Sequence, residues 1–493
     1  MPSLIDFPLE ETFAERMPGF YAACPPASVP EPSLLQFNYA LADELGFETE
    51  PADSNTLAAI LSGNELPESI NPIAQAYAGH QFGGFVPQLG DGRAHLLGEV
   101  VDLNGQRRDI ALKGSGRTPF SRGGDGKAAV GPVLREYIIG EAMHALGIPT
   151  TRALAAVATG ETVMREGQLP GAVLTRVAAS HIRVGTFEFF AARRRFDEVR
   201  QLADYVIDRH YPEHADEEDR YLSLFKAVIE RQASLLSKWM LAGFIHGVMN
   251  TDNMTISGET IDYGPCAFME SYHPLTVFSS IDHGGRYAYR NQPIMAQWNL
   301  TRFAESLLPI IDDEPDLLVE KATEILNGFM PQFDKFWLTG VRAKLGLQDT
   351  EGDDEADRAL AEEWLELLEQ NDVDWTLAWR YLAAAVEENL EPLQSLFRSN
   401  EVLTPWLEKW NSRLCNPTAA TATSMRNVNP IYIPRNHLVE DALTAASDDG
   451  DLNLFEKLLS VIEHPFDERP ELEEYAKPAP SQFTACYKTF CGT

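Results

Sequence analysis

The stretch His246-Gly247-Val248-Met249-Asn250-Thr251-Asp252-Asn253, followed after seven more residues by Ile261-Asp262-Tyr263-Gly264, decides the fold predicted for this chain. Asn253 and Asp262 offer the oxygen ligands that Mg²⁺ takes in proteins, usually together with substrate phosphates. Asp252 stands directly before Asn253. The two stretches together predict a loop that holds a metal ion beside a phosphate-bearing substrate.

The spacing of these residues is that of two protein-kinase motifs. The kinase catalytic loop reads H-R-D-x-x-x-x-N and the metal-binding motif reads D-F-G. His246 and Asn253 keep the first spacing, and we expect His246 to be a structural hydrogen bonder. Val248 occupies the position of the catalytic Asp, and its side chain cannot accept a proton. The loop therefore keeps the residues that hold nucleotide and metal but not the ordinary kinase base.

The order of elements before and after the loop favours the same fold. Hydrophobic patterning predicts strands at 94–100, 109–113, 154–163 and 171–177, and helices at 132–146 and 222–242. We predict an α+β, protein-kinase-like, two-lobed fold with N-terminal and C-terminal extensions. The expected divisions are an N-terminal extension over 1–60, a β-rich nucleotide-binding lobe over 61–180, a helical lobe with the catalytic loop over 181–467, and a C-terminal tail over 468–493.

Cationic and glycine-rich segments predict a phosphate pocket in the β-rich lobe. Lys113 ends an apolar strand and Glu136 lies in the next helix, an arrangement that in kinases holds the lysine over the nucleotide phosphates. Gly90-Asp91-Gly92-Arg93 stands where a glycine-rich loop belongs, although a plain turn is the alternative. The segment 114–127 is rich in glycine and cations and can form an anion nest, or it is a flexible surface loop. Arg176 and Arg183 are candidates for a phosphate clamp or for ordinary charge pairs.

Composition narrows the class of protein. The 493 residues carry a net charge of −34, from 74 acidic and 40 basic side chains, so nucleic acid and anionic membranes are not expected partners. We find no apolar run of the length that a transmembrane helix needs. Five sparse cysteines point to a reducing compartment, and we expect a cytoplasmic protein. The acidic stretch 349–357 is expected to be a solvated face or loop.

Several longer blocks of sequence are similar to the selenoprotein O family, over nearly the whole chain, and we identify the chain as a bacterial member that contains cysteine in place of selenocysteine. The blocks are Pro18–Tyr21, Gln75–Gly83, Gln88–Ala94, Leu112–Arg122, Arg183–Glu188, Asn250–Met254 and Ile281–Tyr289. The resemblance implies a pseudokinase-fold protein adenylyltransferase that binds ATP in reversed orientation and presents its α-phosphate. Its products are an AMP-modified Ser, Thr or Tyr hydroxyl of a protein and pyrophosphate.

The resemblance also implies residue roles at matching positions. It implies Asp252 as the proton acceptor, and Asn253 and Asp262 as ligands of Mg²⁺, with Mn²⁺ as a possible substitute. The implied ATP contacts are Gly90, Gly92, Arg93, Lys113, Asp125, Gly126, Arg176, Arg183 and Asp262.

A redox switch is a further implication of the resemblance. Some family members carry selenocysteine near the C-terminus, where this chain has Cys491. That position is implied to bridge to the activation-loop region, where Cys266 follows Asp262-Tyr263-Gly264. Cys486 is a rival partner, and free thiols are the alternative to any bridge.

Two other functions stay open at this point. A true kinase would need a base other than Val248. A non-catalytic nucleotide-binding scaffold would bind ATP without turning it over. The protein substrates, the preferred hydroxyl and the oligomeric state are not encoded in any pattern that we can read.

Overall fold

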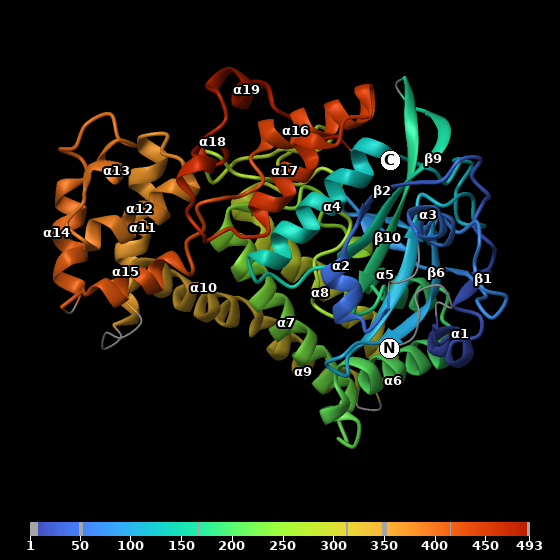
Figure 1. Cartoon of the computed structure of the whole chain (residues 1–493). Helices are drawn as coiled ribbons and strands as arrows, with labels where there is room; N and C mark the ends of the chain where they lie inside the picture. Colours follow the sequence, from blue (N-terminus) through green and yellow to red (C-terminus); the bar gives the residue numbers. More distant parts are fainter. Residues whose placement is uncertain are drawn as a thin grey trace.

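The structure is a computed structural model that describes residues 8–48, 53–165, 167–311, 314–347, 353–414 and 416–490 (Figure 1). Its described part mixes α and β structure, with the longer strands before residue 180 and mostly helices after it. The α+β class predicted from the sequence is therefore confirmed.

The long strands form one antiparallel sheet of eight strands in the described residues. Across the sheet the order is β1 (Tyr21–Ala23), β3 (Ile73–Gln75), β6 (Ala94–Val101), β7 (Arg107–Lys113), β10 (Gln168–Ala178), β9 (Arg152–Met164) and β2 (Ser33–Phe37), and β8 (Ala128–Ala129) pairs with β10. Asp102 caps the β6–β7 turn by accepting from the Asn104 N–H at 2.9 Å, and Gly105 adopts φ 76° there. The four strands and the Asn-Gly turn predicted for this region are confirmed.

Helices pack against this sheet and extend away from it (Figure 1). Those before residue 146 are α1 (Thr12–Arg16), α2 (Tyr39–Glu44), α3 (Ser54–Leu61) and α4 (Val130–Ala145). The next group is α5 (Val184–Ala191), α6 (Phe196–His210), α7 (Arg220–Ala242), α8 (Gln292–Leu307), α9 (Pro315–Asn327) and α10 (Phe329–Leu345).

The remaining helices complete the chain. An outer cluster at the far end of α10 holds α11 (Asp354–Gln370), α12 (Trp375–Val386), α13 (Glu391–Gln394), α14 (Thr404–Arg413) and α15 (Ala419–Arg426). The chain then returns toward the sheet with α16 (Asn436–Thr444), α17 (Asn453–Ile462), α18 (Glu473–Ala476) and α19 (Ser481–Cys486). None of the helices in the described ranges is long and apolar enough to cross a membrane.

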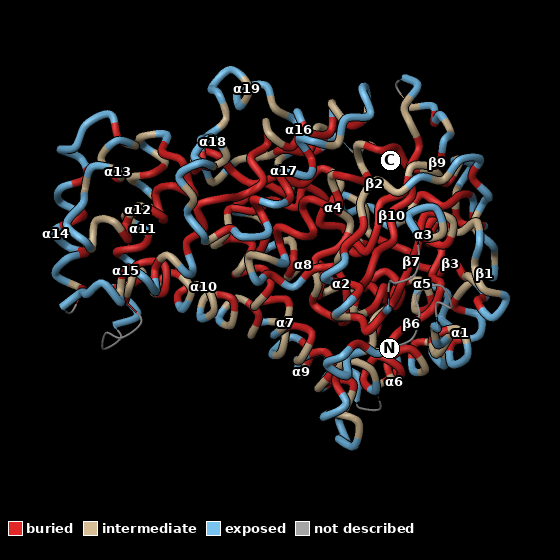
Figure 2. The backbone as a smooth tube through the Cα atoms, in the orientation of Figure 1, coloured by how far each residue is buried: buried red, intermediate tan, exposed pale blue. Residues whose placement is uncertain are grey.

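One buried core joins the sheet to the helices and holds the loop of interest (Figure 2). Helix α4 contacts β9 and β10 on one side and α16 and α17 on the other, and the Tyr137 and Phe455 rings meet edge to face at 5.8 Å. Helix α7 ends at Gly243, as predicted, where φ is 73° and a Cβ would lie 2.6 Å from the Trp375 ring. The chain then runs through β11 (Phe244–Ile245), η2 (Thr251–Asn253) and β12 (Ala267–Phe268). The residues of this loop are therefore anchored on packed elements.

Strands β1 and β2 of the N-terminal segment lie at the two edges of the main sheet, β1 beside β3 and β2 beside β9. One local expectation, that of a solvated acidic stretch, needs correction. In the acidic stretch, residues 348–352 lie outside the described ranges, and Asp357 is fully buried within α11. The prediction of a solvated side chain is wrong for Asp357 because Arg342 and Arg413 satisfy its two oxygens at 2.6 and 2.7 Å.

Lys344 on α10 gives a prediction about stability. Its side chain is buried over the Trp379 ring at 5.2 Å, and burial lowers the pKa of its amine to about 7. The charge penalises folding fully below about pH 7, and the penalty disappears as pH rises toward 10.5, the usual lysine pKa. We expect Lys344→Met to raise the free energy of unfolding by roughly 1–3 kcal/mol at pH 7 and to lose this advantage near pH 10.5. Denaturant titrations at both pH values measure this, and an equal gain at both would contradict it.

Candidate active site

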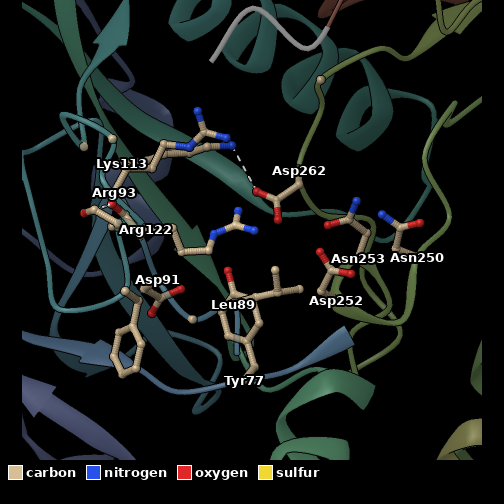
Figure 3. A pocket seen from close by; sticks show the side chains of 18 of the residues that line it. Tyr77, Leu89, Asp91, Arg93, Lys113, Arg122, Asn250, Asp252, Asn253 and Asp262 are labelled. Atoms are coloured by element: carbon tan, nitrogen blue, oxygen red, sulfur yellow. Dashed lines mark hydrogen bonds and ion pairs between the residues drawn. The ribbon is translucent and has the colours of Figure 1, made fainter. Parts of the chain in front are cut away.

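A cavity of about 630 Å³ opens between the sheet and the loop after α7 (Figure 3). Arg93, Arg122 and Lys113 lie on its sheet side, whereas Asp252, Asn253 and Asp262 face them from the loop. Among the described residues, seven Lys and Arg side chains line it against four carboxylates. The structure brings together in this lining the predicted residues Gly90, Gly92, Arg93, Lys113, Asp125, Gly126, Arg176, Arg183, Asp252, Asn253 and Asp262.

A network of buried charges forms the inner end of the cavity. Lys113 on β7 contacts Glu136 of α4 and donates to Asp262 Oδ1 at 3.0 Å. Arg176 on β10 donates to Asp262 at 2.7 Å and to Glu136 at 3.2 Å. Arg183 lies 3.3 Å from the other Asp262 oxygen. Three cations therefore meet two carboxylates, and the predicted pairing of Lys113 with Glu136 is present in the geometry.

Asp262 is held ionised by these neighbours. Burial alone would raise the pKa of its carboxyl, but Lys113, Arg183 and Arg176 outweigh burial and hold this pKa well below the usual range. Its backbone has φ 63°, a left-handed conformation that is uncommon outside glycine and is typical of functional turns. The side chain is 21% exposed, toward the cavity. Asp262 thus offers oxygen ligands at the inner end of the site.

Asp252 lies on η2 at the opposite wall. Its Oδ2 accepts a hydrogen bond from Gln81 Nε2 at 3.2 Å, and Oδ1 has no hydrogen-bond partner among the described residues. Gly79 lets the carboxylate fit, because a Cβ there would come within 2.5 Å of Oδ1. Burial raises the pKa of Asp252 to about 6, so this carboxylate can take up a proton near neutral pH.

Asn253 and Asp262 fit a small divalent cation by the chemistry of their donor atoms. The Asn253 amide donates through Nδ2 to the Val248 carbonyl at 2.9 Å, which leaves its Oδ1 as an acceptor. Val248 itself lines the cavity with an aliphatic side chain. The described residues hold no group of three or more His, Cys, Asp and Glu side chains suited to a metal. Two protein oxygens are nevertheless enough for Mg²⁺ when phosphates and water complete its shell.

The two glycine-bearing segments lie against each other at the outer end. Ser121 Oγ donates to the Gly92 carbonyl at 2.5 Å, and Thr118 Oγ1 donates to the Asp91 carbonyl at 2.7 Å. A Cβ at Gly92 would lie 2.9 Å from the Phe120 carbonyl, so only glycine allows this approach. The segment 90–93 and the loop 114–127 therefore pack directly against each other. Together they place backbone groups and cationic side chains in the lining of the cavity.

Comparison with known proteins identifies the family. Residues 4–463 match the family model described as protein adenylyltransferase SelO. The chain belongs to the SelO family. A protein of Chromobacterium violaceum named protein nucleotidyltransferase YdiU is 60% identical over 97% of this chain and 100% of its own length. Proteins of the same name from Cereibacter sphaeroides and Rhizobium johnstonii are 58% and 56% identical, each over 99% of this chain and over 100% and 97% of their own lengths.

Membership of the SelO family makes the chain a nucleotidyltransferase, as the sequence predicts. The adenylyltransferase description implies ATP and a protein as substrates. The charge of the cavity suits ATP, which is an anion. Cationic side chains outnumber carboxylates in the cavity lining, although the whole chain has a net charge of −34.

Sequence reasoning missed other residues that line this SelO-family cavity. Arg93 is a predicted site residue and Arg122 lies in the predicted cationic loop 114–127; both line the cavity, and neither side chain has an ion-pair partner in the described ranges. Arg165 forms an ion pair with Asp125 at 2.8 Å. Tyr77 lies under the Arg183 guanidinium at 4.5 Å. A block that contains Tyr77 was part of the family resemblance, whereas no motif marked Arg165, which only the β9–β10 turn brings to Asp125.

The structure describes only some of the cysteines that the redox prediction involves. Cys491 lies outside the described residues, so the proposed bridge to Cys266 stays a prediction. Cys266 is a buried free thiol, and burial raises its pKa to about 12, whereas Cys486 is exposed. Thr489 donates to the carbonyl of Pro265 at 2.8 Å, so the described end of the tail reaches the residue before Cys266.

Proposed function

We propose that this protein transfers AMP from ATP to Ser, Thr or Tyr hydroxyls of proteins, with Mg²⁺, and releases pyrophosphate. The observation that carries the proposal is the position of Asp252. This buried carboxylate lines the cationic cavity and has one oxygen without a hydrogen-bond partner among the described residues, while the kinase-base position holds Val248. A cavity with a proton acceptor, cations and two metal-type oxygen donors suits phosphoryl-group chemistry.

The kinase-like two-lobed fold is part of the same proposal. Its support is the strand lysine Lys113 paired with Glu136 on a helix against the sheet, and Asn253 and Asp262 in the loops after α7. These positions correspond to the parts of a kinase site. We propose divisions near residues 60, 180 and 467, with the strands of the first segment joined to the sheet.

The proposed reaction uses the chain's residues as follows. The acceptor hydroxyl oxygen forms a bond to the α-phosphorus of ATP, and the bond from that phosphorus to the β-phosphate bridging oxygen breaks. Asp252 takes the hydroxyl proton, and the electron pair of the broken bond leaves with pyrophosphate. Lys113, Arg176 and Arg183 stabilise the negative charge that grows on the leaving group. In this orientation the outer cations Arg93 and Arg122 remain available to phosphate oxygens.

Asn253 and Asp262 are the residues that would hold Mg²⁺. A bound divalent cation would supply charge neutralisation at the phosphates. Asp262 already keeps Lys113, Arg176 and Arg183 in place, so its carboxylate has a role in organising the site before any substrate binds.

Labelled ATP tests the proposal directly. We expect α-³²P-ATP to label protein covalently, because AMP retains the α-phosphate, and γ-³²P-ATP to label only released pyrophosphate. Mass spectrometry of the labelled protein would give the mass of an AMP adduct on a hydroxyl. Label from the γ-position alone would identify a kinase, and nucleotide binding without label from either position would identify a scaffold.

A further inference from the structure

An exposed apolar surface lies beside the wall of the cavity that carries Asp252. Hairpin strands β4 (Gly79–Gln81) and β5 (Gly84–Val86) present Phe82 and Phe85, which are 38% and 39% exposed. Ile294 of α8 is 53% exposed. We call Phe82, Phe85 and Ile294 the hairpin surface. Exposed apolar clusters next to a site are typical of places where a partner binds.

Aromatic contacts hold the parts of the hairpin surface together. The Phe82 ring lies 5.2 Å from that of Tyr287, and the His80 ring lies 5.3 Å from that of Trp298 on α8. Ile294 precedes Trp298 by one helical turn, which places both on the same side of α8. The hairpin surface therefore combines residues from two separate segments of the chain, the hairpin and α8, and aromatic contacts lie beneath both.

The same hairpin also contacts the proposed base. Gln81 donates to Asp252, and the Phe82 N–H donates to Asn250 Oδ1 at 3.0 Å. The His80 N–H donates to Thr251 Oγ1 at 2.7 Å, so β4 faces the loop. Strand β5 is then the outer strand, and in the described ranges it pairs with β4 alone. An acceptor segment that brings a hydroxyl to Asp252 would pass along this face.

Charge distinguishes this face from the rest of the protein. Residues 75–90 contain no Asp or Glu, and residues 271–302 contain only Asp282. Asp282 is buried and accepts from the N–H groups of Arg286 and Tyr287. Residues 271–302 also contain the cations Arg286, Arg290 and Arg302, of which Arg302 pairs with Glu305 at 2.9 Å, although the whole chain has a net charge of −34. The face therefore complements an acidic partner where most of the protein would repel one.

We propose that the hairpin surface docks the acceptor protein, by binding an extended segment that carries apolar and acidic side chains around the modified hydroxyl. The inference rests on the proposed transfer to a protein hydroxyl. It adds that this surface selects which acceptor proteins are modified. Apolar side chains of the segment pack on Phe82, Phe85 and Ile294. Its main chain follows the outer edge of β5, as in recognition by strand addition.

Synthetic peptides test this inference. The probe is a fluorescein-labelled 13-residue peptide with a central Tyr, two Phe, one Leu and three Asp. One matched peptide has Ser for Phe and Leu, and another has Lys for Asp. Anisotropy with α,β-methylene-ATP measures binding, and α-³²P-ATP measures transfer. The protein variants are Phe85→Ser, Ile294→Ser and, as an exposed apolar control on the far β6–β7 turn, Leu103→Ser, which replaces a side chain that is 64% exposed.

We expect the wild type to bind the apolar acidic peptide about tenfold more tightly than either matched peptide. Phe85→Ser and Ile294→Ser should each reduce this preference about threefold or more and leave the Kd of the ATP analogue unchanged, while Leu103→Ser keeps the preference. Equal binding of all three peptides, or an undiminished preference in both surface variants, overturns the docking surface. Selective binding with no transfer of label by the wild type supports the surface and rejects the proposed function. Transfer of label at equal rates to all three peptides supports the proposed function and rejects the docking surface.

Discussion

Asp252→Asn is expected to lower the turnover number for AMP transfer by roughly 10²–10⁴-fold, the usual contribution of a general base. Asparagine has the shape of aspartate and can still accept the hydrogen bond that Gln81 donates, so the loop should keep its structure. The amide cannot take the proton of the acceptor hydroxyl. Binding of ATP should change by less than about threefold, because the cations that face the phosphates are untouched. Single-turnover transfer from α-³²P-ATP and calorimetric titration with α,β-methylene-ATP measure the two quantities.

Glu259→Gln is the matched control for this prediction. Burial raises the pKa of Glu259 to about 7, so Glu259 resembles Asp252 in being a largely buried carboxylate with a raised pKa. It accepts from the Ala179 N–H at 2.7 Å and does not line the active-site cavity. Glu259→Gln should therefore transfer AMP within about threefold of the wild type. If Asp252→Asn does the same, Asp252 is not the base.

Asp262→Asn is expected to lower AMP transfer by a comparable factor, but to change ATP binding in a different way. The variant loses a charged oxygen ligand of the proposed cation, and we expect turnover to fall on the order of 10³-fold. At the same time Lys113, Arg176 and Arg183 lose the charge that now balances them. Metal-free ATP should consequently bind at least as tightly as it binds to the wild type. The increase in ATP affinity that Mg²⁺ produces in the wild type should be lost.

Titrations of ATP binding with and without Mg²⁺ separate this role from damage to the fold. Thermal unfolding must be measured beside them, because three partly unbalanced cations lower stability. A variant that remains folded and still gains affinity from Mg²⁺ to the wild-type extent would exclude Asp262 as a ligand. A variant that remains folded and transfers AMP at the wild-type rate would exclude it from the reaction.

Local sequence was enough to predict the main elements of the sheet and the loop. The strands around Asn104-Gly105 and the helix that ends at Gly243 follow from periodicity and turn chemistry, which act over a few residues. Asn253, Asp262 and Asp252 could be singled out because a motif spacing is preserved in one short stretch. The burial of Asp357 could not be predicted in this way. It depends on arginines from two other helices, whereas the acidic run by itself indicates solvent exposure.

The sequence by itself determined which chemical groups this protein has for a phosphate and a metal, and in which order along the chain they occur. Only the tertiary structure decided how they are used. It gathers Lys113, Arg176 and Arg183 around one carboxylate, places Gln81 and Gly79 against Asp252, and sets exposed aromatic rings beside that acid. The hydrogen bond between Gln81 and Asp252 alone joins residues 171 positions apart. Their burial and charge balance arise only when distant segments pack together, and no local pattern in the sequence records them.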